Sequence, residues 1–135
     1  MQINDRMRDF AARYAAAWCS RNPASVAAFH AMDGSLSING GPAARGRAAI
    51  EAEARAFMNA FPDMRVSFDR LVESGNLMQF HWTLTGTYTG PGGTGKRVRI
   101  SGFEEWRISG DGLIAESQGH FDADDYKRQL EHGAD

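Results

Sequence analysis

Apolar residues follow a helical spacing in the first third of the chain. Over residues 3–21 the side chains of Met7, Phe10, Tyr14 and Trp18 recur at intervals of three and four. This spacing puts them on one face and predicts an amphipathic helix. Tyr14 has two possible roles, because it joins an apolar ring to a hydroxyl: core packing, or donation of a hydrogen bond into a cavity.

Two further helices are predicted, with one short strand between them. The pair Asn-Pro opens a helix over about 23–32, since Asn is a good N-cap and Pro suits the first helical position. His30 falls at the end of this helix, where we expect a surface or capping role. Residues 34–39 predict a short strand. The helical spacing returns over 47–61 and ends at Pro62, which disfavours helix in the residue before it.

The second half of the chain predicts four long strands and a final helix. Alternating apolar and polar residues, rich in Thr and aromatic side chains, occupy 64–72, 77–90, 97–108 and 113–122. Such alternation is typical of strands with one buried face. A short helix is expected over 122–132. Helices with one short strand, followed by four antiparallel strands, indicate an α+β fold in a single domain, 1–135.

One strand carries a carboxylate in an otherwise apolar row. Within 97–108, alternate residues share a face, and this face holds Val98, Ile100, Gly102, Glu104, Trp106 and Ile108. We therefore expect Glu104 to point inward. A shift of the register by one residue would instead turn Glu105 inward and leave Glu104 to pair with Arg97, Arg99 or Arg107.

Composition excludes several classes of function. The net charge of −2 favours neither nucleic acid nor an anionic membrane. Cys19 is the single cysteine, so no internal disulfide can form, and no stretch approaches the ~20 apolar residues of a membrane span. We expect a cytoplasmic protein. The loop 90–97 has the spacing of a phosphate loop, but a strand follows it, so we expect no bound nucleotide.

Two carboxylates close to an apolar surface suggest acid/base chemistry. Glu104 lies in the apolar row, and Asp122 follows an aromatic residue at the end of the last strand. Burial disfavours a charged carboxylate, so Glu104 would hold its proton, while Asp122 would ionise more easily. Asp122 has an alternative role as N-cap of the last helix. The pair His120 and Asp122 is too small a set to predict a metal site, so we expect neither a metal nor a cofactor.

The order of these segments resembles the SnoaL-like branch of the nuclear transport factor 2-like superfamily, which includes ketosteroid isomerases, limonene epoxide hydrolases and polyketide cyclases. The resemblance covers nearly the whole chain and rests on three segments, FAARYAAAWCSRNPASVAAF, RGRAAIEAEARAFMNAFPD and GFEEWRISGDGLIAESQGHFD. It implies a cone-shaped, curved antiparallel sheet with three helices on its concave side. It also implies a pocket for a small hydrophobic molecule and a homodimer through the convex face.

The resemblance also suggests roles for individual residues. Tyr14 is similar to the tyrosine that donates to the enolate oxygen in ketosteroid isomerases, Glu104 to its partner acid, and Asp122 to the acid/base aspartate of the cyclases. Three departures stand out. No carboxylate lies near Ile38 or Asn39, where the isomerase base is expected; Gly102 replaces an arginine of the epoxide hydrolases; and Gln118 replaces a tryptophan common in the last strand.

These inferences predict a pocket and leave its use open. Asp122, Glu104 and Tyr14 are the predicted catalytic residues. The predicted lining is Trp18, Phe57, Met58, Phe61, Phe80, Trp82, Ile100, Trp106, Gln118 and His120. The favoured function is cyclisation, isomerisation or dehydration of a hydrophobic oxygenated compound. A non-catalytic binding module and a dimerisation domain with a filled core are the alternatives.

Overall fold

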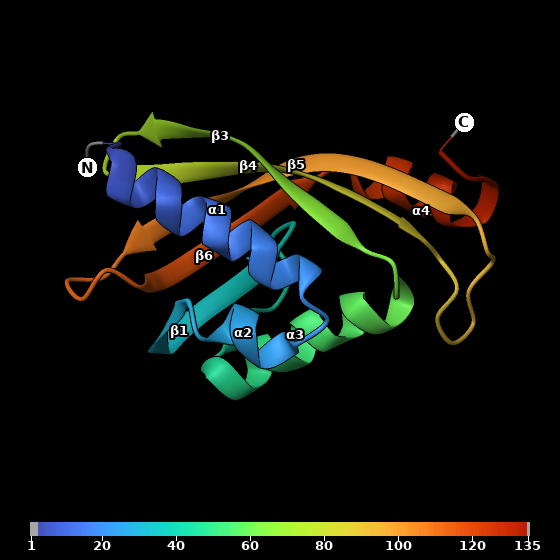
Figure 1. Cartoon of the computed structure of the whole chain (residues 1–135), viewed down its shortest axis with the longest axis horizontal. Helices are drawn as coiled ribbons and strands as arrows, with labels where there is room; N and C mark the ends of the chain where they lie inside the picture. Colours follow the sequence, from blue (N-terminus) through green and yellow to red (C-terminus); the bar gives the residue numbers. More distant parts are fainter. Residues whose placement is uncertain (1–2, 135) are drawn as a thin grey trace.

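The computed structural model describes residues 3–134. Its helices and strands alternate in the first half of the chain, and strands dominate the second half (Figure 1). In chain order they are α1 (Asp5–Cys19), α2 (Pro23–Ala27), β1 (His30–Ile38), β2 (Ala44–Arg45), α3 (Arg47–Ala60), β3 (Arg65–Ser74), β4 (Leu77–Thr87), β5 (Arg97–Ile108), β6 (Ile114–Phe121) and α4 (Ala123–His132). None of the helices in this part of the chain is both long and apolar enough to cross a membrane.

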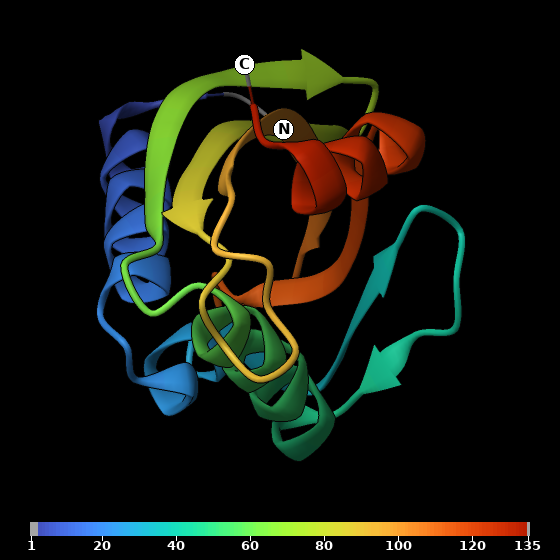
Figure 2. The same cartoon turned by 90° about the vertical axis from the view of Figure 1, so that its right-hand side faces the viewer.

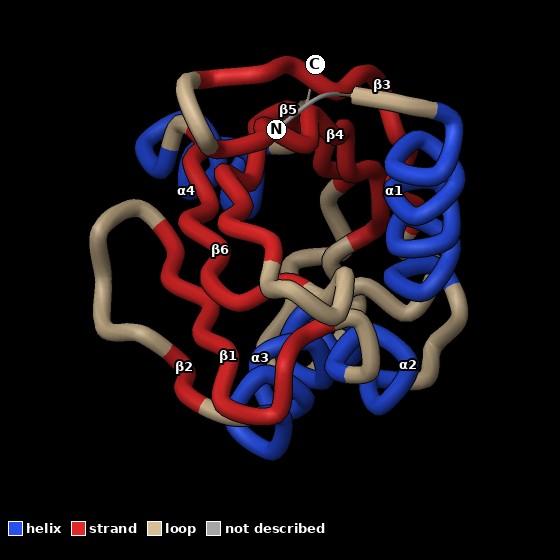
Figure 3. The backbone as a smooth tube through the Cα atoms, turned by 90° about the vertical axis from the view of Figure 1, so that its left-hand side faces the viewer, coloured by secondary structure: helices blue, strands red, loops and turns tan. Residues whose placement is uncertain are grey.

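The six strands form one curved, open sheet in the order β2-β1-β6-β5-β4-β3. The predicted α+β fold with a curved sheet is confirmed. One pair of neighbouring strands is not antiparallel: β1 and β6 run parallel. The long segment from β2 through α3 to β5 connects these two strands and allows this direction. Figure 3 shows β2, β1 and β6 side by side.

The helices cover the concave side of the sheet. In Figure 2 the long strands bend around the interior, with α1 (blue) at the left, α3 (green) below and α4 (red) at the upper right. Tyr14 on α1 and Ile50 on α3 are fully buried, as the helical spacing requires. Asn4 caps α1 through its side chain, and Asn22 caps α2 in the same way.

The second helix and the strand after it differ from the prediction. Helix α2 ends at Ala27, and strand β1 already begins at His30. His30 is completely buried, so the expectation of a surface or capping histidine is wrong. The reason is tertiary: the amide of Ile114 on β6 donates to the carbonyl of Phe29 at 2.9 Å, which draws this segment into the sheet.

Strand β5 has the register that its pattern predicted. Val98, Ile100, Glu104 and Trp106 are buried on the concave face, whereas the neighbouring Glu105 is only half-buried. Glu104 makes no salt bridge among the described residues, so the alternative pairing with an arginine does not occur.

Gly102 is where β5 passes closest to its neighbours. A Cβ atom here would lie 2.8 Å from Cζ2 of Trp82 and would also collide with the carbonyl oxygen of His120. The arginine expected from the epoxide hydrolases therefore has no room at this position.

Candidate active site

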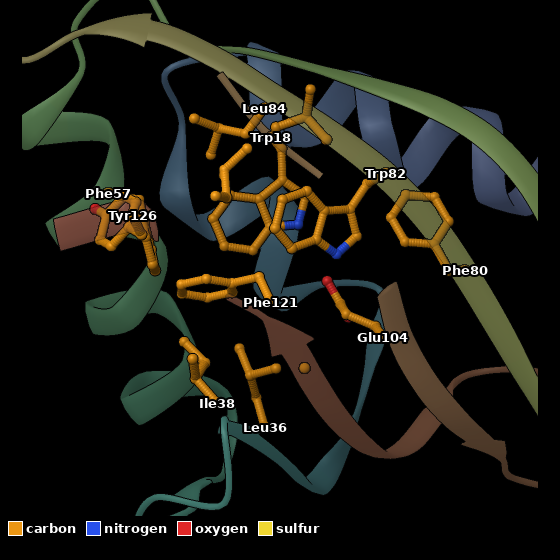
Figure 4. Close-up of a pocket in the computed structure, with 13 residues that line it drawn as sticks. Trp18, Leu36, Ile38, Phe57, Phe80, Trp82, Leu84, Glu104, Phe121 and Tyr126 are labelled. Carbon is orange, nitrogen blue, oxygen red and sulfur yellow. The ribbon is translucent and has the colours of Figure 1, made fainter. Parts of the chain in front are cut away.

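A cavity lies between the concave face of the sheet and helices α1, α3 and α4 (Figure 4). Its lining is almost entirely apolar and comprises Trp18, Leu36, Ile38, Phe57, Val66, Phe80, Trp82, Leu84, Ile100, Glu104, Gly119, Phe121 and Tyr126. Glu104 is the single charged side chain among them. The volume of the cavity that is open to the centre of a water molecule is about 60 Å³.

Six residues predicted for the site belong to this lining, and seven do not. The structure places Trp18, Phe57, Phe80, Trp82, Ile100 and Glu104 on the cavity. It places Tyr14, Met58, Phe61, Trp106, Gln118, His120 and Asp122 elsewhere. The lining residues among the predicted set come from α1, α3, β4 and β5.

The predicted residues that do not line the cavity are kept away from it for different physical reasons. Met58 and Phe61 are buried in the core between α3 and the sheet. Strand β6 turns Ser117, Gly119 and Phe121 inward, so Gln118 and His120 face away from the cavity. Phe121 is a lining residue that the sequence analysis missed, although strict alternation along β6 would have found it.

Glu104 lies at the centre of a buried hydrogen-bond network. Its Oε1 accepts from the Tyr14 hydroxyl at 2.9 Å, the Trp106 indole Nε1 at 3.0 Å and the Ser117 hydroxyl at 2.7 Å. Its Oε2 receives only a longer contact from the same Tyr14 hydroxyl, at 3.1 Å. The two carboxyl oxygens are therefore unequal: three donors surround Oε1, and Oε2 is left largely free.

This environment favours a neutral acid. Burial raises the pKa of Glu104 above its usual value of 4.5, although the hydrogen bonds from Trp106, Ser117 and Tyr14 oppose that shift. Three donors already surround Oε1, so the proton of the neutral acid belongs on Oε2. Glu104 can therefore present an O–H group to the cavity.

Tyr14 contacts Glu104 but does not itself line the cavity. Its ring packs edge-on against Phe80 and Trp106, with ring centroids 5.3 Å apart in both pairs. Burial is the main cause that raises the pKa of its hydroxyl well above the usual value of 10, so Tyr14 remains a neutral donor. Its position makes it a group that orients Glu104.

Asp122 takes the alternative role that the sequence allowed. Its carboxylate accepts from the backbone N–H of Asp125 at 3.0 Å and caps α4. The side chain is exposed and does not line the cavity. The structure therefore does not bring the two predicted carboxylates together.

His30 is a buried polar residue for which the sequence analysis expected a surface or capping role. Its Nδ1 lies 3.1 Å from the carbonyl oxygen of Val26, and its Nε2 has no partner among the described residues. Burial lowers its pKa from 6.5 to about 4. The His30 ring packs against the Tyr14 ring, with centroids 5.8 Å apart, and so contacts one of the residues that donate to Glu104. Within residues 3–134, no three His, Cys, Asp or Glu side chains cluster in a way that could hold a metal ion.

The curved six-stranded sheet with its covering helices is the fold of solved structures described as ketosteroid isomerase-like and nuclear transport factor 2-like. Within this class, the chain belongs to the SnoaL-like domain family, whose model matches residues 11–117. No curated protein matches the sequence.

Solved structures share the fold over almost the whole chain. A protein with a ketosteroid isomerase-like fold from Catenulispora acidiphila DSM 44928, in complex with trimethylamine, has a TM-score of 0.79 at 18% identity and covers 91% of this chain and 92% of its own. A protein from Jannaschia sp. CCS1 described as a SnoaL-like polyketide cyclase has a TM-score of 0.76 at 15% identity, with 98% and 99% covered. SalBIII, an epoxide hydrolase/cyclase-like enzyme of pyran ring formation in the polyether salinomycin, has a TM-score of 0.75 at 15% identity, with 92% and 96% covered.

Proposed function

We propose that this protein is an enzyme in which Glu104 carries out acid/base chemistry on a compact, apolar, oxygen-bearing compound. One observation carries the proposal: Oε1 of Glu104 is held by three donors while Oε2 is left for the apolar cavity. Burial raises the pKa of this carboxyl group, and a raised pKa favours the protonated form that general acid catalysis uses.

A single carboxyl can complete a balanced proton transfer. The acid first gives the Oε2 proton to a carbonyl or ether oxygen of the substrate. The carboxylate that remains is stabilised by the donors from Tyr14, Trp106 and Ser117. It then removes a proton from a carbon of the same substrate, so the enzyme returns to its starting state. Isomerisation, cyclisation and dehydration of a ring compound all contain steps of this kind.

The similarity to SalBIII and to the Jannaschia protein supports small-molecule chemistry in this cavity. The lining of the cavity is almost entirely apolar, which supports an apolar substrate. The alternative is a binding module that holds the same compound without converting it.

Exchange of carbon-bound protons distinguishes these two functions without knowledge of the natural substrate. Cyclohexanone is incubated with the protein in D₂O, and loss of its α-proton signals is followed by ¹H NMR. We expect the wild-type protein to accelerate exchange and Glu104→Gln to lose at least about a hundredfold of that acceleration. Asp122→Asn is the matched control: Asn is an equally good N-cap, so exchange should continue at the wild-type rate.

Two outcomes would contradict the enzyme. Binding of cyclohexanone without faster exchange would favour the binding module. Equal exchange by wild-type protein and Glu104→Gln would remove Glu104 from the chemistry.

We also propose a homodimer through the convex face. On this face the ring of Phe103 is flanked by His81 and His120, with centroid distances of 5.1 Å and 4.9 Å. All three side chains are only partly covered by the protomer itself. An aromatic row of this kind, in the middle of the sheet, is typical of the apolar centre of a protein interface.

A further inference from the structure

The indole groups of the three tryptophans differ in their contacts. Trp106 Nε1 donates to Glu104 at 3.0 Å. The Trp18 ring packs edge-on against the Tyr14 ring, with ring centroids 6.3 Å apart. No hydrogen bond from Trp82 Nε1 is found among residues 3–134, and this side chain is partly exposed. Because indole N–H can only donate, it is free to bind an acceptor that enters the cavity.

The strand register brings Trp82 close to Glu104. On β4 and β5, Phe80 pairs with Glu104 and Trp82 pairs with Gly102. Trp82 and Glu104 are therefore diagonal neighbours on one face, a separation of about 7–8 Å that aromatic side chains can span. Both residues line the cavity, and in Figure 4 the nitrogen of the Trp82 indole points toward the carboxyl group of Glu104.

The Trp82 ring is also held in place. It lies over Gly102, where a Cβ atom would come within 2.8 Å of its Cζ2. On the cavity side it packs edge-on against Phe121, with ring centroids 6.0 Å apart. The direction of its N–H group is therefore fixed before a ligand enters, which lowers the entropic cost of binding.

We propose that the Trp82 indole N–H is a second donor for the substrate, and that it binds the same oxygen that receives the proton of Glu104. A carbonyl oxygen has two lone pairs and can accept from both groups at once. The site thus selects compounds with a carbonyl or enolate oxygen over hydrocarbons of the same shape. This inference rests on the proposed function in its choice of substrate, but the contact itself can be measured without turnover.

The test uses two ligands of equal shape. Cyclohexanone carries the acceptor oxygen, and methylenecyclohexane has a CH₂ group in its place. In ¹H–¹⁵N spectra of the wild-type protein, the Trp82 indole signal is assigned by its absence in Trp82→Phe. We expect cyclohexanone to move this signal downfield and methylenecyclohexane to leave it near its original position. The Trp106 signal is the internal control, because its N–H is already bound to Glu104.

Affinity provides the second measurement. Titrations followed by the other tryptophan signals should show that Trp82→Phe binds cyclohexanone about three- to tenfold more weakly than wild type, the usual effect of one neutral hydrogen bond. Its affinity for methylenecyclohexane should be unchanged. An unmoved Trp82 signal at saturation, an equal loss for both ligands, or no binding of cyclohexanone would each overturn the proposal. A moved signal without α-proton exchange would support the Trp82 contact while contradicting the enzyme.

Discussion

Replacing Glu104 with leucine should destabilise the protein far more than replacing it with glutamine. Leucine offers no acceptor, so the buried donors of Tyr14, Trp106 and Ser117 would all lose their partner. An unsatisfied buried donor costs about 1–3 kcal/mol, so the three together should cost roughly 3–9 kcal/mol. A domain usually has only about 5–15 kcal/mol of stability, so Glu104→Leu should be close to unfolding at room temperature. In Glu104→Gln the amide oxygen replaces Oε1 and keeps all three donors, and we expect a change within about 1 kcal/mol.

The difference between glutamine and the native glutamate should also depend on pH. Burial raises the pKa of Glu104 above 4.5, so the folded state holds the proton more tightly than the unfolded chain does. A raised pKa stabilises the fold below the unfolded pKa, and this contribution is lost as the pH rises through the folded pKa. The Glu104→Gln variant does not lose this contribution, because glutamine does not titrate. The stability of the variant relative to wild type should therefore increase as the pH rises above about 4.5.

Urea unfolding at pH 5 and pH 8, followed by tryptophan fluorescence, measures the cost of each substitution and its pH dependence. The slope of the unfolding free energy against urea concentration checks that the denatured states are comparable. Equal unfolding midpoints for the leucine and glutamine variants would show that the three donors do not depend on Glu104. A glutamine-minus-wild-type difference that stays constant with pH would show that Glu104 is not a buried titrating group. Either result would refute the basis of the proposed chemistry.

Two further predictions concern His30 and the convex face. Burial lowers the pKa of His30 to about 4, so its contribution to stability is complete above pH 6.5 and falls by up to roughly 3 kcal/mol as the pH drops toward 4. Urea unfolding between pH 7 and 4 should show that the unfolding free energy of His30→Leu decreases less than that of wild type. An identical pH dependence for the two proteins would contradict the buried neutral ring. Phe103→Arg should convert the proposed dimer into a monomer in sedimentation equilibrium while leaving ligand binding intact, and a wild-type protein that is already monomeric at about 100 μM would exclude the dimer.

The sequence predicted the parts of the fold that depend on local periodicity. The three-and-four spacing over α1 and α3, and the alternation along β5, each placed the correct residues in the core. The inward direction of Glu104 followed from that alternation alone. The end of α2 could not be predicted in this way, because the backbone pairing of β1 with β6 decides it. The paired residues His30 and Ile114 are 84 residues apart in the chain.

The candidate site was predictable in its residue types and not in its geometry. An apolar row with one acid indicated a buried carboxyl, but the sequence could not show that Tyr14 lies behind this acid or that Ser117 binds it. It also left Asp122 with two possible roles, and the position of α4 selected the helix cap.

What the sequence determined by itself is thus the set of faces: which side of each helix and strand avoids water. That information is local, because side-chain direction repeats with the period of the backbone. Which faces meet is decided only by the tertiary structure. The curvature of the sheet brings Trp82 and Glu104 toward one cavity and leaves Asp122 outside it. Close approach of strands, as at Gly102, depends on contacts between segments far apart in the chain, and no local pattern records such contacts.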